Sequence, residues 1–309
     1  MMMLLKLITA VAAFTATASA GLIQRGDAAA DAINTTTLAT LNLYEQYSAA
    51  AYCTRNTIAS PGTLITCAAG NCPLVETNGA TIAYSFKDIG VGDVSGFLAV
   101  DPTNSLLVLA FAGIRDIAGW ITKLNDRLVP STTVCGTTAN CTVHQGFLNS
   151  WSSVSGIIVP QIINASATTG FTTLVLTGHG FGGALAALAT AQFRTTPIGN
   201  IAITTLLTYG SPRVGNTAFA TYLTTTNATT FNFRVTHTDD PVPKFPSRAL
   251  GYLQWGPEYW IRSPTGAPVR TFDVDQINGT ETSTGNSGTP FSLDFPAHFW
   301  YFNAIAACK

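Results

Sequence analysis

The chain has 309 residues, of which 47% are hydrophobic and 10% are charged, and its formal net charge is -1. An average soluble domain has about 25% charged residues, and proteins that bind nucleic acid present a basic surface that this balance does not supply. Composition therefore excludes nucleic acid as the partner and suits a secreted protein whose surface is rich in Thr, Ser, Asn and glycans.

The first 20 residues are typical of a secretory signal. Lys6 precedes an apolar core over 7–14, and Ala18-Ser19-Ala20 forms a small-residue cleavage site. The apolar core is too short to span a bilayer and does not recur, so we expect no transmembrane segment. We assign 1–20 to the signal, leave 21–27 open as a short propeptide, and assign 28–309 to one domain of an extracellular protein.

Alternating helices and strands predict an α/β fold. Helices are expected at 37–52, 146–163, after the turn at 178–183, and in the C-terminal tail at 296–307. Strands are expected at 82–86, 96–101, 106–111, 174–176, 203–209 and 231–238. This alternation indicates a mostly parallel central sheet with helices on both faces, in a single domain.

A glycine-rich turn between a strand and a helix is the most informative feature. An apolar run over 174–176 leads into the turn at 178–183, and an alanine- and leucine-rich run follows to residue 188. Strand, tight glycine turn and helix form the context in which G-x-S-x-G makes a nucleophile elbow. The central position, where the serine belongs, is Gly180. The chain has the strand–turn–helix pattern of an acyl-transfer elbow and lacks the nucleophilic serine.

A serine hydrolase of this type places an acid and then a histidine after the nucleophile. Of the four histidines, His179 lies within the turn and His144 precedes a helix, which favours structural roles for both. His237 lies at the end of a strand, beside Asp239 and Asp240, and His298 lies at a loop-to-helix junction near the C-terminus. By their order along the chain, Asp240 and His298 are the candidate acid and base. Either residue alone would more often be structural; the elbow upstream reverses that preference.

Six cysteines in an exported chain imply three disulfides, for which fifteen pairings exist. Spacing favours two small loops, Cys67–Cys72 and Cys135–Cys141, which would leave Cys53 and Cys308 to tie the first helix to the C-terminus. Metal binding is the alternative, but no CxxC or nearby His pair accompanies these cysteines, so we expect no metal.

Five N-x-[ST] sequons support export, although some are expected by chance in a chain so rich in threonine. They are the candidate glycosylation sites Asn34, Asn140, Asn164, Asn227 and Asn278.

The chain resembles the secreted fungal triacylglycerol lipases and feruloyl esterases of lipase class 3, an α/β-hydrolase family. The similar segments occur in the same order over nearly all of the mature chain, at 47–53, 111–115, 143–147, 173–188, 209–216, 237–243, 256–261 and 296–298. The resemblance implies that Asp240 and His298 take the acid and base positions. It implies the disulfides Cys53–Cys308, Cys67–Cys72 and Cys135–Cys141. It also implies that 117–124, with Trp120, is a lid helix that a lipid surface opens.

Two departures from the family pattern fall in the expected active site. Gly180 stands in place of the nucleophilic serine. At the oxyanion hole the family usually has Arg and then Ser or Thr where this chain has Ala112 and Ile114. The backbone N–H groups of Ile114 and Phe181 still suit an oxyanion, so the hole is expected to be weakened. Loss of a triad serine costs about a million-fold in turnover and loss of one oxyanion donor about a hundred- to a thousand-fold.

Three functions remain open at this point. The first is a secreted lipase-like protein, inactive or strongly impaired, that binds lipid through the former site. The second is an enzyme in which the Asp240–His298 dyad acts with water or in a non-hydrolytic reaction. The third is a structural or host-interaction protein that makes no use of the pocket. We expect a monomer without metal or organic cofactor, whose partner is a lipid or ester small molecule, or a lipid–water interface.

Overall fold

The computed structural model describes residues 32–123, 127–225, 231–293 and 295–308. The signal at 1–20, the segment at 21–27 and the sequon at Asn227 lie outside the described residues. The described residues all fall in one compact unit.

The main sheet is parallel in its centre and antiparallel at both edges. Within the described ranges it contains eight strands: β1 (Thr81–Ile89), β2 (Val94–Asp101), β3 (Leu106–Phe111), β6 (Thr173–His179), β7 (Ala202–Tyr209), β9 (Phe231–His237), β11 (Glu258–Ile261) and β12 (Val274–Ile277), side by side in that order. The pairings from β3 through β11 are parallel. The pairings of β1 with β2, β2 with β3 and β11 with β12 are antiparallel. The predicted α/β-hydrolase architecture is confirmed.

Helices cover both faces of this sheet, and four very short strands form a second one. The helices are α1 (Thr35–Ala50), α2 (Thr54–Thr57), α3 (Pro73–Thr77), α4 (Ile117–Lys123), α5 (Thr132–Cys135), α6 (Gln145–Thr169), α7 (Phe181–Thr195) and α8 (Thr217–Thr224). The second sheet joins β4 (Leu128–Pro130), β5 (Thr142–His144), β8 (Gly215–Asn216) and β10 (Tyr252–Leu253) in the order β10-β8-β5-β4. Sequence patterning did not predict these short strands.

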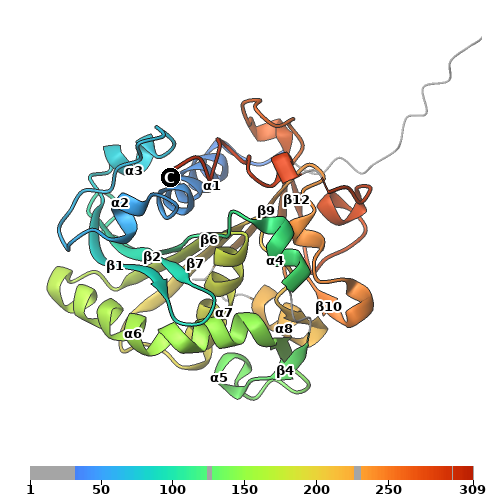
Figure 1. Cartoon of the computed structure of the whole chain (residues 1–309), viewed down its shortest axis with the longest axis horizontal. Coiled ribbons are helices and arrows are strands. Elements are labelled where there is room, and N and C mark those ends of the chain that lie inside the picture. Colours follow the sequence, from blue (N-terminus) through green and yellow to red (C-terminus); the bar gives the residue numbers. More distant parts are fainter. Residues whose placement is uncertain (1–31, 124–126, 226–230, 294, 309) are drawn as a thin grey trace, which may run out of the picture. The chain divides into compact units, whose positions relative to one another are not determined.

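The two faces of the sheet form two cores. Leu174 and Leu176 of β6 pack in the cluster that contains the buried faces of α6 and α7. Val175, between them, packs in the cluster that contains α1. Figure 1 shows α1 on one side of the sheet and α6 and α7 on the other. Burial on both faces explains why the central strands are continuous apolar runs.

The C-terminal tail is not the helix that we predicted for 296–307. Only a single 3-10 turn forms, over Phe295–Ala297, and turns and an isolated bridge between Trp300 and Ala304 follow. Polar residues do not recur at helical spacing in the tail, so a helix there would have no hydrophilic face. Its residues are instead held individually, Tyr301 by Asp240 and Asn303 by Glu45. Tertiary contacts therefore override local propensity here.

The tail is also tied to the first helix region. The structure contains the disulfides Cys53–Cys308, Cys67–Cys72 and Cys135–Cys141, the pairing that the resemblance implies. In Figure 1 the C-terminus lies beside α1. No described helix is long and apolar enough to cross a bilayer.

Candidate active site

The elbow turn joins β6 to α7 at Gly180, whose φ is 53° and ψ is -121°. A positive φ of this kind favours glycine. The Gly180 N–H donates to the Tyr209 carbonyl at 2.8 Å. The flanking glycines are required by close backbone approach, because a Cβ on Gly178 would lie 2.3 Å from the Gly182 carbonyl oxygen and one on Gly182 would lie 2.4 Å from that of Phe111.

Gly180 differs from those two glycines because a side chain there would meet no backbone. A Cβ at Gly180 would lie 3.0 Å from His298 Nε2 and 3.4 Å from its Cε1. The turn thus aims the position of a nucleophile directly at an imidazole nitrogen. A hydroxyl one bond beyond that Cβ would lie beside Nε2, which is the contact a serine–histidine pair requires.

The structure brings Asp240 and His298 together although 58 residues separate them. His298 Nδ1 lies 2.9 Å and 3.0 Å from the two Asp240 carboxylate oxygens, and both side chains are buried. A carboxylate only accepts hydrogen bonds, so Nδ1 carries the proton and Nε2 of the neutral ring faces Gly180. Tyr301 donates to Asp240 at 2.7 Å and the Val242 N–H at 2.9 Å. Burial, and then the Asp240 charge, raise the pKa of Tyr301 well above its usual value.

His179 lies beneath the turn, as expected, and contacts the backbone of His298. Its Nδ1 is 2.6 Å from the Tyr52 hydroxyl and its Nε2 is 2.8 Å from the His298 carbonyl oxygen. Burial, and then the neighbouring His298 ring, hold the pKa of His179 well below its usual value. A neutral His179 suits this geometry, because one ring nitrogen must donate to the carbonyl and the other can accept from Tyr52.

The other two histidines lie outside this pair and contact backbone groups. His237 bridges the carbonyls of Ala297 and Ser263, each at 2.8 Å. His144 Nδ1 accepts from the Phe147 N–H at 3.2 Å and caps α6. Burial lowers the pKa of His144 to about 4, which keeps this acceptor neutral.

A small cavity of about 10 Å³ lies at the dyad. Ile114 and Phe181, the expected oxyanion-hole residues, border it together with Gly180 and His298. Across the described part of the chain, no carbonyl or side chain accepts a hydrogen bond from the Ile114 or Phe181 N–H. A cavity of this size holds about one water molecule.

Helix α4 closes that cavity. Ile117 and Trp120 of α4 border it, and the Trp120 ring stacks on Phe147 with ring centroids 5.9 Å apart. The predicted lid segment is therefore helical over 117–123 and lies over the dyad; residue 124 is outside the described residues. Anything larger than a water requires α4 to move. Opening at a lipid surface stays a prediction.

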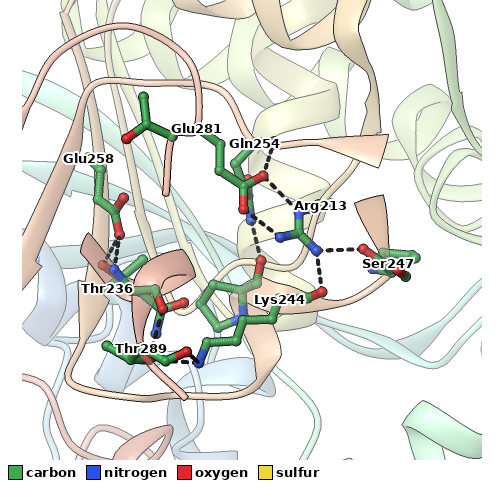
Figure 2. Close-up of polar contacts among 12 residues, drawn as sticks. Arg213, Thr236, Lys244, Ser247, Gln254, Glu258, Glu281 and Thr289 are labelled. Atoms are coloured by element: carbon green, nitrogen blue, oxygen red, sulfur yellow. Dashed lines mark hydrogen bonds and ion pairs between the residues drawn. The ribbon is translucent and has the colours of Figure 1, made fainter. Parts of the chain in front are cut away.

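A buried polar network, which sequence reasoning missed, holds the loop that carries Asp240 (Figure 2). Arg213 forms an ion pair with Glu281, and its guanidinium also donates to the carbonyls of Lys244 and Pro246 just after Asp240. Burial raises the pKa of Glu281, but Arg213 outweighs it and holds that pKa below the usual value. The Asn286 amide donates to the Asp240 carbonyl at 2.9 Å.

The remaining predicted residues lie away from the dyad. Among the described residues, the groups whose donor atoms lie close enough to hold a metal all contain disulfide-bonded cysteines, which do not present free thiolates. The exposed sequon residues are Asn34, Asn140, Asn164 and Asn278. Their exposure permits glycosylation, which stays a prediction.

The sequence and the fold both have clear relatives. The family model for class 3 lipase matches residues 108–250, and that for the lipase 3 N-terminal region matches residues 6–84. Secreted mono- and diacylglycerol lipase A from Penicillium cyclopium is 39% identical over 299 residues, which cover 96% of this chain and 95% of that one. The chain belongs to the class 3 lipase family.

Two solved structures show the same architecture. The mono- and diacylglycerol lipase of Aspergillus oryzae superposes with a TM-score of 0.81 at 36% identity, over 89% of this chain and 100% of that one. A triacylglycerol lipase with a serine-protease triad as its catalytic centre superposes with a TM-score of 0.72 at 27% identity, over 89% and 98%. This member of the class 3 family has Gly180 at the elbow.

Proposed function

We propose that this protein is a secreted lipase-like protein with little or no turnover of glycerides, which retains a ligand site at the former catalytic centre. The observation that carries the proposal is Gly180 in an elbow whose backbone, acid and base are otherwise in place. A related triacylglycerol lipase uses a serine-protease triad, and this position offers no hydroxyl. Without it, no acyl-enzyme can form on residue 180.

The expected loss is large. Removal of a triad serine costs about a million-fold in turnover, and a weakened oxyanion hole costs a further hundred- to thousand-fold or so. Ile114 supplies only its backbone N–H where the resemblance implies a hydroxyl residue. The loss of the nucleophile dominates, because without it the tetrahedral intermediate that the oxyanion hole stabilises does not form on residue 180.

The reactivation assay tests this proposal. Hydrolysis of p-nitrophenyl butyrate and of monooleoylglycerol is measured for the purified native protein and for Gly180→Ser, with Gly180→Ala as the matched control. We expect Gly180→Ser to raise kcat/KM at least about a thousand-fold, Gly180→Ala to give no gain, and Ile114→Ser added to Gly180→Ser to give a further rise. Robust glyceride hydrolysis by the native protein, abolished by His298→Ala, would refute the proposal.

The ligand and location follow from the same comparison. Relatives named as secreted mono- and diacylglycerol lipases support an acylglycerol or another ester as the ligand and export through the segment at 1–20. Helix α4 with Trp120 would then act as a lid at a lipid–water interface. Asp240 and His298 would be retained as the acid and base of the family triad. We propose a monomer, glycosylated at one or more exposed sequons.

A second candidate function keeps hydrolysis but uses water. The water-sized cavity between His298 and α4 favours it, since His298 with Asp240 could act as a general base on a bound water. It predicts a slow native ester hydrolysis that Asp240→Asn and His298→Ala both abolish and that leaves no acyl group on the protein. Absence of any such His298-dependent hydrolysis across short- and long-chain esters would exclude it.

A further inference from the structure

Of the described residues that border the cavity beside Gly180, His298 alone carries a nucleophilic side chain. Its Nδ1–H is directed to Asp240, at 2.9 Å and 3.0 Å from the two oxygens, so Nε2 of the neutral ring holds a lone pair. That Nε2 lies 3.0 Å from where a Cβ on Gly180 would be. Once α4 moves aside, a carbonyl carbon that enters the space normally filled by a nucleophilic side chain therefore meets Nε2 itself.

The other ring nitrogens are engaged or enclosed. Both nitrogens of His179 and both of His237 lie within hydrogen-bond distance of protein oxygens. His144 does not border this cavity, and its Nδ1 accepts from Phe147. His298 is as buried as His144, at 1% exposed, so an ester reaches its Nε2 only once α4 moves away from the cavity.

We propose that His298 Nε2 is a direct acyl acceptor, so that the site forms an N-acylimidazole with esters that have good leaving groups. The inference rests on the proposed function in one respect, that an ester enters the former site. It differs from the water candidate because the protein itself becomes acylated.

Each step conserves atoms and charge. The Nε2 lone pair attacks the ester carbonyl carbon, and the carbonyl oxygen becomes an oxyanion beside the Ile114 and Phe181 N–H groups. The C–O bond to the alcohol breaks, the alkoxide or phenolate departs and takes a proton from solvent, and an acylimidazolium remains whose positive charge faces Asp240. Water then attacks the acyl carbon and releases one proton to solvent, the C–N bond breaks, and the carboxylic acid and neutral His298 are released.

The same chemistry determines the substrate class. Imidazole is a better leaving group than a glycerol alkoxide, so the tetrahedral intermediate from a glyceride expels imidazole and returns to the starting ester. Electron-poor phenolates such as p-nitrophenolate leave about as readily as imidazole. The site should therefore react with activated aryl esters and leave glycerides intact, which reverses the preference expected of a glyceride lipase.

Acyl transfer to His298 is tested by acid-quenched mass spectrometry and peptide mapping of the full-length protein after mixing with p-nitrophenyl acetate. We expect acetyl on the His298 peptide in the native protein, removed by hydroxylamine, and none from monoacetylglycerol. Lys87, with a side chain 38% exposed, reports unspecific surface acylation in the same digest. The matched variant is Gly180→Ala, whose methyl fills the approach to Nε2 and should abolish the His298 adduct while leaving the Lys87 signal unchanged.

Two results of the acylation experiment would overturn the inference. One is p-nitrophenolate release that depends on His298 without acetyl on its peptide, since that pattern requires water as the nucleophile. The other is an adduct on His298 that is undiminished in Gly180→Ala, which would place the reaction outside the cavity. Ligand binding is measured separately, from the Trp120 contribution to fluorescence on titration with monooleoylglycerol. Binding without an adduct refutes only the acyl transfer; absence of both refutes the proposed ligand site as well.

Discussion

Removing one partner of the buried Arg213–Glu281 pair should strongly destabilise the region around Asp240. Both side chains are almost fully buried, at 4% and 2% exposed, and Arg213 also donates to the Pro246 carbonyl at 2.7 Å. Arg213→Met leaves the Glu281 carboxylate buried with the Gln254 N–H at 3.1 Å as its remaining backbone partner. Breaking such a pair from one side costs about 3–5 kcal/mol in the free energy of unfolding. With an m value of about 3 kcal/mol/M, the urea midpoint should fall by about 1–1.7 M.

Urea unfolding followed by circular dichroism at pH 7 measures this change. The double variant Arg213→Met with Glu281→Leu should recover most of the loss, because it removes the uncompensated charge. The exposed pair Lys87–Asp88 provides a matched control, and Lys87→Met should cost less than about 1 kcal/mol. Since the folded pKa of Glu281 is depressed, the contribution is present above the unfolded pKa and is lost as the pH falls through the folded value. A loss below about 1 kcal/mol for Arg213→Met would refute the reasoning.

Two further predictions concern stability. Burial depresses the pKa of His144 from 6.5 to about 4, so its contribution to stability is full above pH 6.5 and declines as the pH falls towards 4. The variant His144→Asn keeps a capping side chain and should flatten the fall in Tm between pH 7 and pH 4.5. An unchanged slope of Tm against pH would contradict this. The disulfide Cys53–Cys308 spans 255 residues and Cys67–Cys72 spans 5. Replacing each pair by serines should cost about 5 and about 2 kcal/mol respectively, measured by urea unfolding, and the reverse order would contradict the loop-closure argument.

The central sheet could be predicted because the burial of its strands on both faces is visible in the sequence. Strands such as β3 and β6 are buried on both faces, so they are continuous apolar runs that end at glycine-rich turns. The strand β11 was not predicted, because the buried Glu258 within it depends on partners distant in sequence, Arg234 and Thr236 of the neighbouring strand and the Asn286 N–H. The strands β8 and β10 have two residues each and are too short for any period.

The dyad could be predicted from order along the chain, whereas its supports could not. An acid and a histidine that follow an elbow have few alternatives in a sequence with four histidines. Tyr301, Asn286 and Tyr52 leave no comparable signal, since each acts through hydrogen bonds whose partners are distant in sequence. The one available clue was that Tyr301 follows His298 by three residues, and it was obscured by the incorrect helix prediction for the tail.

Gly180 shows why the fold could be inferred more firmly than the activity. The glycines at 178 and 182 are imposed by backbone atoms within 2.4 Å of any Cβ, and the elbow backbone therefore persists whatever stands between them. Residue 180 meets only the end of an imidazole, so a side chain there is limited by its positive φ of 53° and by a 3.0 Å contact of Cβ with Nε2, and by no backbone atom. Loss of a serine at such a position removes the reaction and leaves β6, α7 and the Asp240–His298 contact intact. A Gly180→Ser substitution should for the same reason restore chemistry without rebuilding the site.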